Sequence, residues 1–178
     1  MTTRTLDRPA TYDDLRGLPP EARAEIFDGV IVMSPGASPQ HNRAARYLAN
    51  ALEVAGQPHG YLVNTDNDVQ WHPTAVTRPD VCVVAEAHAN DQPITHYPVL
   101  VVEVLSPGSA ARDLVRKRAY CETARVPEYW VVDLAERQLF RHHFVDSDTH
   151  YTVDTIDAGD TVTIDAPFPL VVDTGVIL

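Results

Sequence analysis

The chain has 178 residues, of which 14 are basic and 25 acidic, and its formal net charge is −11 when histidine is neutral. This length predicts one domain with an ordinary core, and a composition of 44% hydrophobic and 22% charged residues excludes a disordered or fibrous protein. No apolar run reaches the roughly 18 residues of a membrane helix and no signal core precedes the first charged residues, so we expect a cytoplasmic protein without membrane contact.

The first elements are marked by turn and cap residues. Thr11 is a typical N-cap and predicts a helical turn that ends before Pro19. The dipeptide Asp28-Gly29 separates two short apolar runs and predicts a tight β-hairpin. Ser38, followed by a proline, predicts the start of a helix over residues 40–54.

The middle and the end of the chain contain mostly strands. A further helix is expected at residues 110–123, with Ser109 as its cap, and Cys82 and Cys121 are expected to be buried and reduced. Strands are expected at residues 61–64, 69–71, 81–85, 99–105 and 128–133, and edge strands at 138–144, 151–156 and 161–164.

This order of elements predicts a fold of the α/β class, of α+β type. Strands and helices mix without strict alternation, which favours a central mixed β-sheet flanked by helices. We expect a single domain over residues 1–178, with a core at about 12–144 and a strand-rich C-terminal extension at 145–178.

Two acidic residues stand beside or inside apolar strands. Glu103 is flanked by aliphatic residues on both sides, and a carboxylate is costly to bury without a cation or several hydrogen bonds. A buried ion pair with an arginine, or an edge strand with one wet face, would explain it as well as a functional site would. Asp80 precedes the strand 81–85, where it is either a turn residue or a partner of Glu103.

Lys117 is the only lysine among the 14 basic residues, because the other 13 are arginines. A pair with Asp113 on the surface of the helix is the simplest reading, and such pairs contribute little. The composition favours another reading, in which this position requires the compact charge of an ammonium group.

These residues form an ordered signature that resembles a known family. Its pieces are Glu25-Ile-Phe-Asp-Gly, Ser38-Pro-Gln-His41, Arg78-Pro-Asp80, Val-Val-Glu103-Val-Leu-Ser-Pro, Lys117 with Tyr120, and Val126-Pro-Glu-Tyr-Trp. The signature resembles the Uma-type family of restriction endonucleases, a branch of the PD-(D/E)XK nuclease superfamily. It implies a restriction-endonuclease-like core.

The resemblance also implies a set of site residues. Asp80 and Glu103 would hold Mg²⁺ or Mn²⁺, and Glu25 would be a third acid that binds the ion directly or supports it. The superfamily usually has its lysine two positions after the glutamate, where this chain has Leu105, and Lys117 matches the lysine that this family presents from the next helix. His41 matches the family's Ser-Pro-x-His piece, with a role in orientation or phosphate contact.

The expected activity is metal-dependent hydrolysis of phosphodiester bonds in DNA. Two-fold symmetry would suit a small nuclease that cuts both strands, which favours a homodimer. The chief alternative is a catalytically silent binding or regulatory module with the same fold, which the net charge favours. A cupin-like enzyme would need converging histidines, and the spacing of the eight histidines does not supply them, so all except His41 are expected at the surface.

Overall fold

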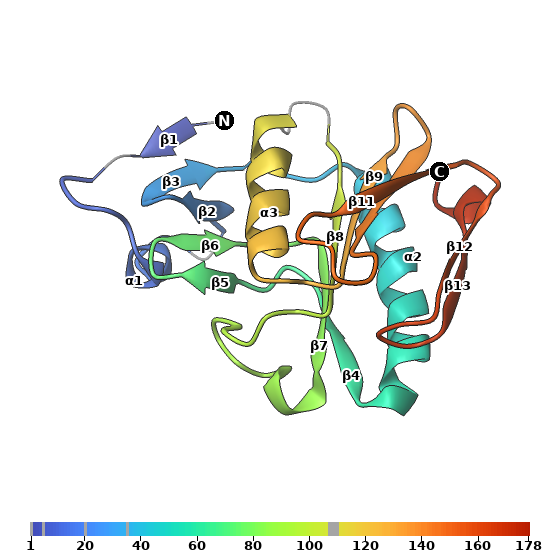
Figure 1. Ribbon diagram of the computed structural model, residues 1–178. Coiled ribbons are helices and arrows are strands. Elements are labelled where there is room, and N and C mark those ends of the chain that lie inside the picture. Colours follow the sequence, from blue (N-terminus) through green and yellow to red (C-terminus); the bar gives the residue numbers. More distant parts are fainter. Residues whose placement is uncertain (1, 5, 20, 35, 107–110) are drawn as a thin grey trace.

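The computed structural model describes residues 2–4, 6–19, 21–34, 36–106 and 111–178. Two β-sheets lie side by side, with helix α3 (Ala111–Thr123) in front of them and helix α2 (Pro39–Gly56) on the far side of the larger sheet (Figure 1). The expected cap of α3, Ser109, lies outside the described residues.

The larger sheet has six strands in the order β11-β10-β9-β8-β7-β4. Only β8 and β9 run parallel, so the sheet is mixed, as the sequence predicts. A parallel pair needs a long crossover, and α3 supplies it. The strands are β4 (Tyr61–Asn64), β7 (Val81–Ala85), β8 (Leu100–Val104), β9 (Glu128–Asp133), β10 (Gln138–His143) and β11 (Thr152–Asp157).

The smaller sheet has five antiparallel strands in the order β1-β3-β2-β6-β5. Its strands are β1 (Thr2–Arg4), β2 (Ala24–Phe27), β3 (Val30–Met33), β5 (Val69–His72) and β6 (Ala75–Thr77). Asp28 and Gly29 have φ of 50° and 82°, the left-handed conformations that a two-residue hairpin turn requires, so the predicted hairpin is confirmed. The sequence did not predict a second sheet, because β1 and β6 have only three residues each.

Helices α1 (Tyr12–Arg16) and α2 begin as their cap residues predict. Thr11 precedes α1, where Asp14 accepts a hydrogen bond from the backbone N–H of Thr11 at 2.8 Å. Ser38 caps α2, and its Oγ accepts from the backbone N–H of His41 at 3.2 Å. Both helix starts are therefore fixed by hydrogen bonds within the first turn.

Each face of the six-stranded sheet has its own core. Alternate residues of β7 point to opposite faces, so Val81 and Val83 pack toward α2 while Cys82 and Val84 pack toward α3. Cys82 and Cys121 are buried and unpaired, as expected. The strands β12 (Thr161–Ile164) and β13 (Leu170–Asp173) form a hairpin that closes the α2 side.

The expectation that His142 lies at the surface is wrong. His142 lies on β10 and is 9% exposed, with its ring 5.4 Å from that of Tyr129, because the alternation of the strand turns it into the α3 side of the core.

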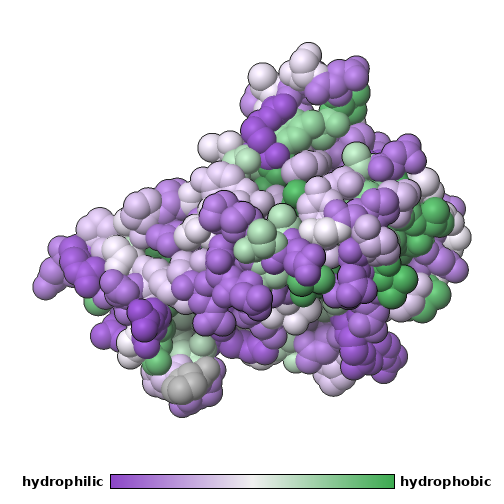
Figure 2. Space-filling model, turned by 90° about the horizontal axis from the view of Figure 1, so that it is seen from below, coloured by the Kyte–Doolittle hydropathy of each residue, from purple (hydrophilic) through white to green (hydrophobic). Residues whose placement is uncertain are grey.

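The face seen in Figure 2 is largely hydrophilic, with most of its apolar surface toward one edge. No helix in the described parts of the chain is long and apolar enough to cross a membrane.

Candidate active site

Glu103 points out of β8 toward α3. Its neighbours Val102 and Val104 pack on the α2 side, so strand alternation turns Glu103 to the opposite face, where it is 5% exposed. β8 lies between β7 and β9, which excludes the edge-strand explanation of this carboxylate. The arginine partner is also wrong, because the cation beside Glu103 is a lysine.

That cation is Lys117. Its Nζ lies 3.0 Å from Oε1 and 3.0 Å from Oε2 of Glu103, and 2.9 Å from Oε1 of Glu25. Lys117 is one helical turn before the fully buried Cys121, so the same face of α3 carries both residues into the protein. Lys117 is 9% exposed, so its side chain is buried and not at the helix surface as the reading with Asp113 required, and the side chain of Asp113 lies outside the described residues.

Glu25 reaches Lys117 from the smaller sheet. On β2, Ala24 and Ile26 pack in the core beside α1, so Glu25 points to the other side. Oε1 of Glu25 also accepts a hydrogen bond from the backbone N–H of Arg78 at 2.7 Å. The side chains of Glu25, Lys117 and Glu103 therefore join both sheets through α3.

Asp80 and His41 form a second group beside Glu103. Asp80 stands directly before β7, and its Oδ2 accepts a hydrogen bond from the backbone N–H of Val104 at 2.7 Å. Nε2 of His41, in the first turn of α2, lies 3.1 Å from the same oxygen. These contacts fix the Asp80 carboxylate next to the strand residue that follows Glu103.

The charges of the cluster perturb one another. Burial raises the pKa of Glu103, the negative charges of Asp80 and Glu25 add to this, and Lys117 opposes it. Burial alone would lower the pKa of Lys117, but the attraction of Glu103 and Glu25 raises it. The hydrogen bond to Asp80 raises the pKa of His41 against the effect of burial.

The donor set fits a divalent cation. Three carboxylates and one ammonium leave two negative charges when His41 is neutral, and buried Oε1 of Glu103 contacts the Lys117 ammonium only as an ion pair, without a hydrogen bond. The carboxylate oxygens of Asp80, Glu103 and Glu25 do not all lie within 4.8 Å of one another. In the described ranges, only one other group of acidic and histidine side chains meets that criterion. An ion here would complete its shell with water, as Mg²⁺ usually does.

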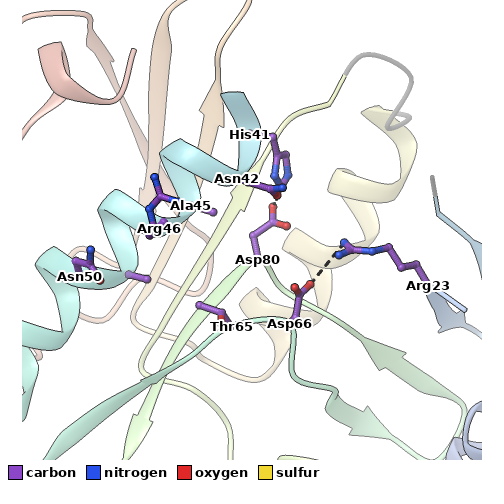
Figure 3. Close-up of a pocket in the computed structure, with 10 residues that line it drawn as sticks. Arg23, His41, Asn42, Ala45, Arg46, Asn50, Thr65, Asp66 and Asp80 are labelled. Atoms are coloured by element: carbon purple, nitrogen blue, oxygen red, sulfur yellow. Dashed lines mark ion pairs between the residues drawn. The ribbon is translucent and has the colours of Figure 1, made fainter. Parts of the chain in front are cut away.

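A cavity of about 310 Å³ opens beside Asp80 and His41 (Figure 3). Asn42, Arg46 and Asn50 line it from α2, since residues four apart share one face of a helix. Across the cavity, Arg23 lies 3.7 Å from Asp66. These residues were not identified from the sequence, although their spacing of four, opposite the apolar face of Ala44, Leu48 and Leu52, was a visible signal.

A known protein family matches most of this chain. The family Uma2, described as "Putative restriction endonuclease", matches residues 9–174, and the chain belongs to this family. This confirms the resemblance found in the sequence.

A solved structure supports the same fold. The crystal structure of "a putative nuclease belonging to DUF820" from Anabaena variabilis ATCC 29413 is similar to this chain with a TM-score of 0.71 and 18% sequence identity. The match covers 89% of this chain and 90% of that one. No curated protein matches the chain.

Proposed function

We propose that this protein is a divalent-metal-dependent endonuclease that hydrolyses phosphodiester bonds of DNA. The observation that carries the proposal is the buried ammonium of Lys117, 3.0 Å from Glu103 and 2.9 Å from Glu25. A buried ion cluster of this kind is costly to maintain for stability alone. Asp80, which is held beside Glu103 by the N–H of Val104, lines an open cavity, and this favours a chemical role for the cluster.

Asp80 and Glu103 are the proposed ligands of Mg²⁺ or Mn²⁺, with Glu25 as the third acid. When bound, such an ion lowers the pKa of a water molecule and polarises the scissile phosphate. Asp80 is held by the N–H of Val104 and by His41, so its free oxygen is oriented before any ligand arrives.

Lys117 is proposed to stabilise negative charge that develops on the phosphate. Its raised pKa keeps the ammonium protonated near neutral pH, which suits a charge stabiliser and disfavours the role of a general base. Glu103 and Leu105 share one face of the extended chain, so a lysine at position 105 would project to the same side as Glu103. Lys117 supplies this charge from α3 instead.

His41 is proposed as a positioning residue that acts through Asp80. Its Nε2 holds Oδ2 of Asp80 at 3.1 Å, and its backbone N–H is occupied by the cap residue Ser38. The cavity next to it offers Arg23, Arg46 and the amides of α2, which are suitable donors to phosphate oxygens. We therefore propose that the DNA backbone enters along this face of α2.

The test is cleavage of supercoiled plasmid and of single-stranded DNA with Mg²⁺, with Mn²⁺ and with EDTA. We expect cleavage by the wild-type protein only with a divalent ion, and loss of cleavage in Glu103→Gln. Glu53→Gln is the matched control, because it makes the same substitution at a carboxylate that accepts a backbone hydrogen bond from Val63 at 2.7 Å and lies outside the cluster. Equal cleavage by all three proteins would mean a contaminating nuclease and would reject the proposal.

The alternative is a catalytically silent module, which the net charge of −11 favours. It would keep the fold for binding or regulation, without cleavage of plasmid or single-stranded DNA. Calorimetric titration with Mn²⁺, run beside the cleavage assay, separates the two functions, because absence of binding at millimolar Mn²⁺ would favour the module.

A further inference from the structure

A second group of metal-binding side chains lies far from the proposed active site. His88 ends the short helix η2 (Glu86–His88), and Asp91 and His96 follow in the loop that leads to β8. In the described chain these are the only three His, Cys, Asp or Glu residues whose ligand atoms all lie within 4.8 Å of one another. Asp80 and His88 lie beyond opposite ends of β7, whose five residues span about 17 Å.

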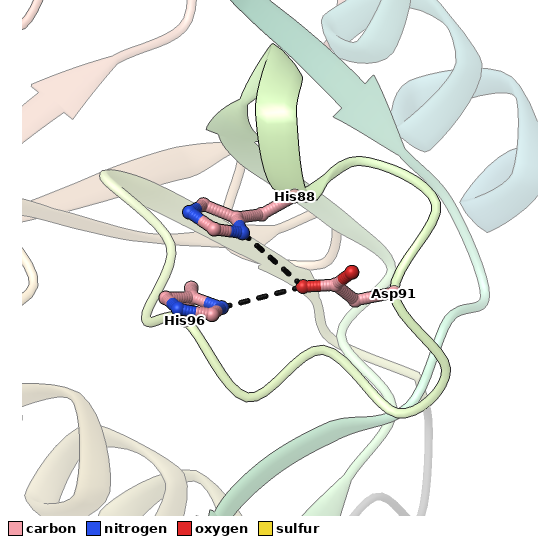
Figure 4. Close-up of side chains that lie close together, drawn as sticks. All are labelled: His88, Asp91 and His96. Carbon is pink, nitrogen blue, oxygen red and sulfur yellow. Dashed lines mark hydrogen bonds and ion pairs between the residues drawn. The ribbon is translucent and has the colours of Figure 1, made fainter.

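The contacts within the group are convergent. Nδ1 of His88 and Nδ1 of His96 each lie 3.3 Å from the same oxygen, Oδ2 of Asp91 (Figure 4). In a tetrahedral zinc site with ligands about 2.0–2.1 Å from the ion, neighbouring ligand atoms are about 3.3 Å apart. The spacing between the carboxylate and each imidazole is therefore that of a zinc site.

The loop that carries these residues is fixed on both sides. The backbone N–H of Ile94 donates to Asp68 at 2.9 Å and its carbonyl accepts from Gln70 at 2.9 Å, and Ile94 is fully buried. The hydroxyl of Tyr97 donates to the carbonyl of Trp71 at 3.0 Å. His96 thus lies between two anchored residues, and Asp91 lies three residues before the first of them, which limits the entropy lost when these side chains bind an ion.

We infer that His88, Asp91 and His96 form a site for a divalent transition-metal ion of the zinc type, with water in the fourth position. Two imidazoles and one carboxylate suit zinc, whereas Mg²⁺ and Ca²⁺ prefer oxygen ligands. The site is distinct from the proposed magnesium site in both its donors and its location.

Binding requires one rearrangement. The rings of His88 and His96 are stacked with their centroids 3.4 Å apart and an interplanar angle of 12°, so their Nδ1 lone pairs run nearly parallel. An ion lies in the plane of each imidazole that binds it, so one ring must turn away from the stack. The side chain of His96 is 59% exposed and has space to do so.

The two Nδ1–Oδ2 distances of 3.3 Å would also arise if His88 and His96 only formed hydrogen bonds with Asp91 and bound no metal. Titration with zinc distinguishes a metal site from such a hydrogen-bonded group. We suggest calorimetry of the tag-free, EDTA-treated and dialysed protein with Zn²⁺ in the presence of excess Mg²⁺. The variants are His88→Ala, His96→Ala and Asp91→Asn. The matched control is His150→Ala, because the side chain of His150 is 85% exposed and lies outside the group.

We expect the wild type and His150→Ala to bind one Zn²⁺ ion at this site. Loss of a supporting group outside the ligands already weakens metal sites 10–100-fold, so loss of a ligand should weaken binding by at least about 100-fold in each of the three variants. Thermal unfolding should show a rise in Tm with zinc that the three variants lack. Absence of zinc binding, or equal binding by His88→Ala and His150→Ala, would overturn the inference.

Discussion

The Nζ of Lys117 lies 3.0 Å from both carboxylate oxygens of Glu103, one residue on α3 and the other on β8. Both side chains are buried, so neither charge is solvated by bulk water. Lys117 lies in the crossover that joins the parallel strands β8 and β9, Glu103 lies on β8, and Glu25 adds a carboxylate from the second sheet. Its consequences for stability and for activity are separable by mutation.

Replacing Lys117 by methionine should destabilise the metal-free protein by about 3 kcal/mol, because Glu103 and Glu25 would remain buried without their cation. Urea denaturation in EDTA measures this. Arg118→Met, on the same helix, removes one positive charge without breaking the cluster and should change stability by less than about 1 kcal/mol. Equal losses in the two variants would contradict the energetic role of the cluster.

Asp80→Asn should abolish cleavage while the protein stays folded. Asparagine keeps an acceptor for the N–H of Val104 but removes the charge that the proposed ion needs. Glu53→Gln changes a carboxylate with an equivalent backbone contact, to Val63, and should keep the wild-type rate. Plasmid nicking by proteins matched for folded fraction gives the comparison, and a fully active Asp80→Asn would remove Asp80 from the proposed site.

A second buried ion pair offers a contrast. Glu128 is 3% exposed and binds Arg141 through two hydrogen bonds of 2.6 and 2.9 Å, and it also accepts from Trp130 at 2.8 Å. Arg141→Met should cost about 2–3 kcal/mol in urea denaturation, since Trp130 remains as a partner. Cleavage per folded molecule should not change. A loss of cleavage per folded molecule as large as that of Asp80→Asn would contradict the proposal that the active site is confined to the cluster of Lys117, Glu103, Glu25 and Asp80.

The buried His142 should make stability depend on pH. Burial lowers the pKa of His142 to about 4, with a smaller contribution from the charge of Arg118, against 6.5 in its ordinary state. The unfolded chain therefore binds a proton that the folded chain does not between these values, so stability falls as the pH falls from about 6.5 to about 4.

For this residue we expect a loss of about 2 kcal/mol between pH 7 and pH 5. His142→Phe keeps an aromatic ring beside Tyr129 and should remove this part of the pH dependence. Urea denaturation of both proteins at the two pH values measures the difference. Identical pH dependence in wild type and variant would contradict the buried neutral imidazole.

Much of the fold could be predicted from local signals. The bounds of β7 and β9 match the expected strands, because continuous apolar runs mark strands covered on both faces. The start of α2 follows from Ser38 and Pro39. The smaller sheet could not be predicted, since β6 is a three-residue strand whose pairing with β2 and β5 depends on contacts distant in sequence.

Some residues of the candidate site could be identified from local signals in the sequence, and others could not. Glu103 and Lys117 are anomalous in the sequence itself, one as an acid in an apolar strand and the other as the sole lysine. Glu25 and His41 were identified only through the family resemblance, because nothing local shows that β2 and α2 approach the cluster. His88, Asp91 and His96 were not identified, since their convergence depends on how Ile94 anchors the loop.

The proposed role of Lys117 is tested most directly by the single-turnover cleavage rate of Lys117→Met with saturating Mn²⁺. Removal of one stabilising charge from an active site commonly costs about 10²–10³-fold in rate, so we expect a loss of this size. The affinity for Mn²⁺, measured by calorimetry on the same protein, should stay equal or increase, because a competing positive charge has left the acids. A rate within threefold of wild type (about 0.7 kcal/mol) at saturating Mn²⁺ would contradict a catalytic role for Lys117.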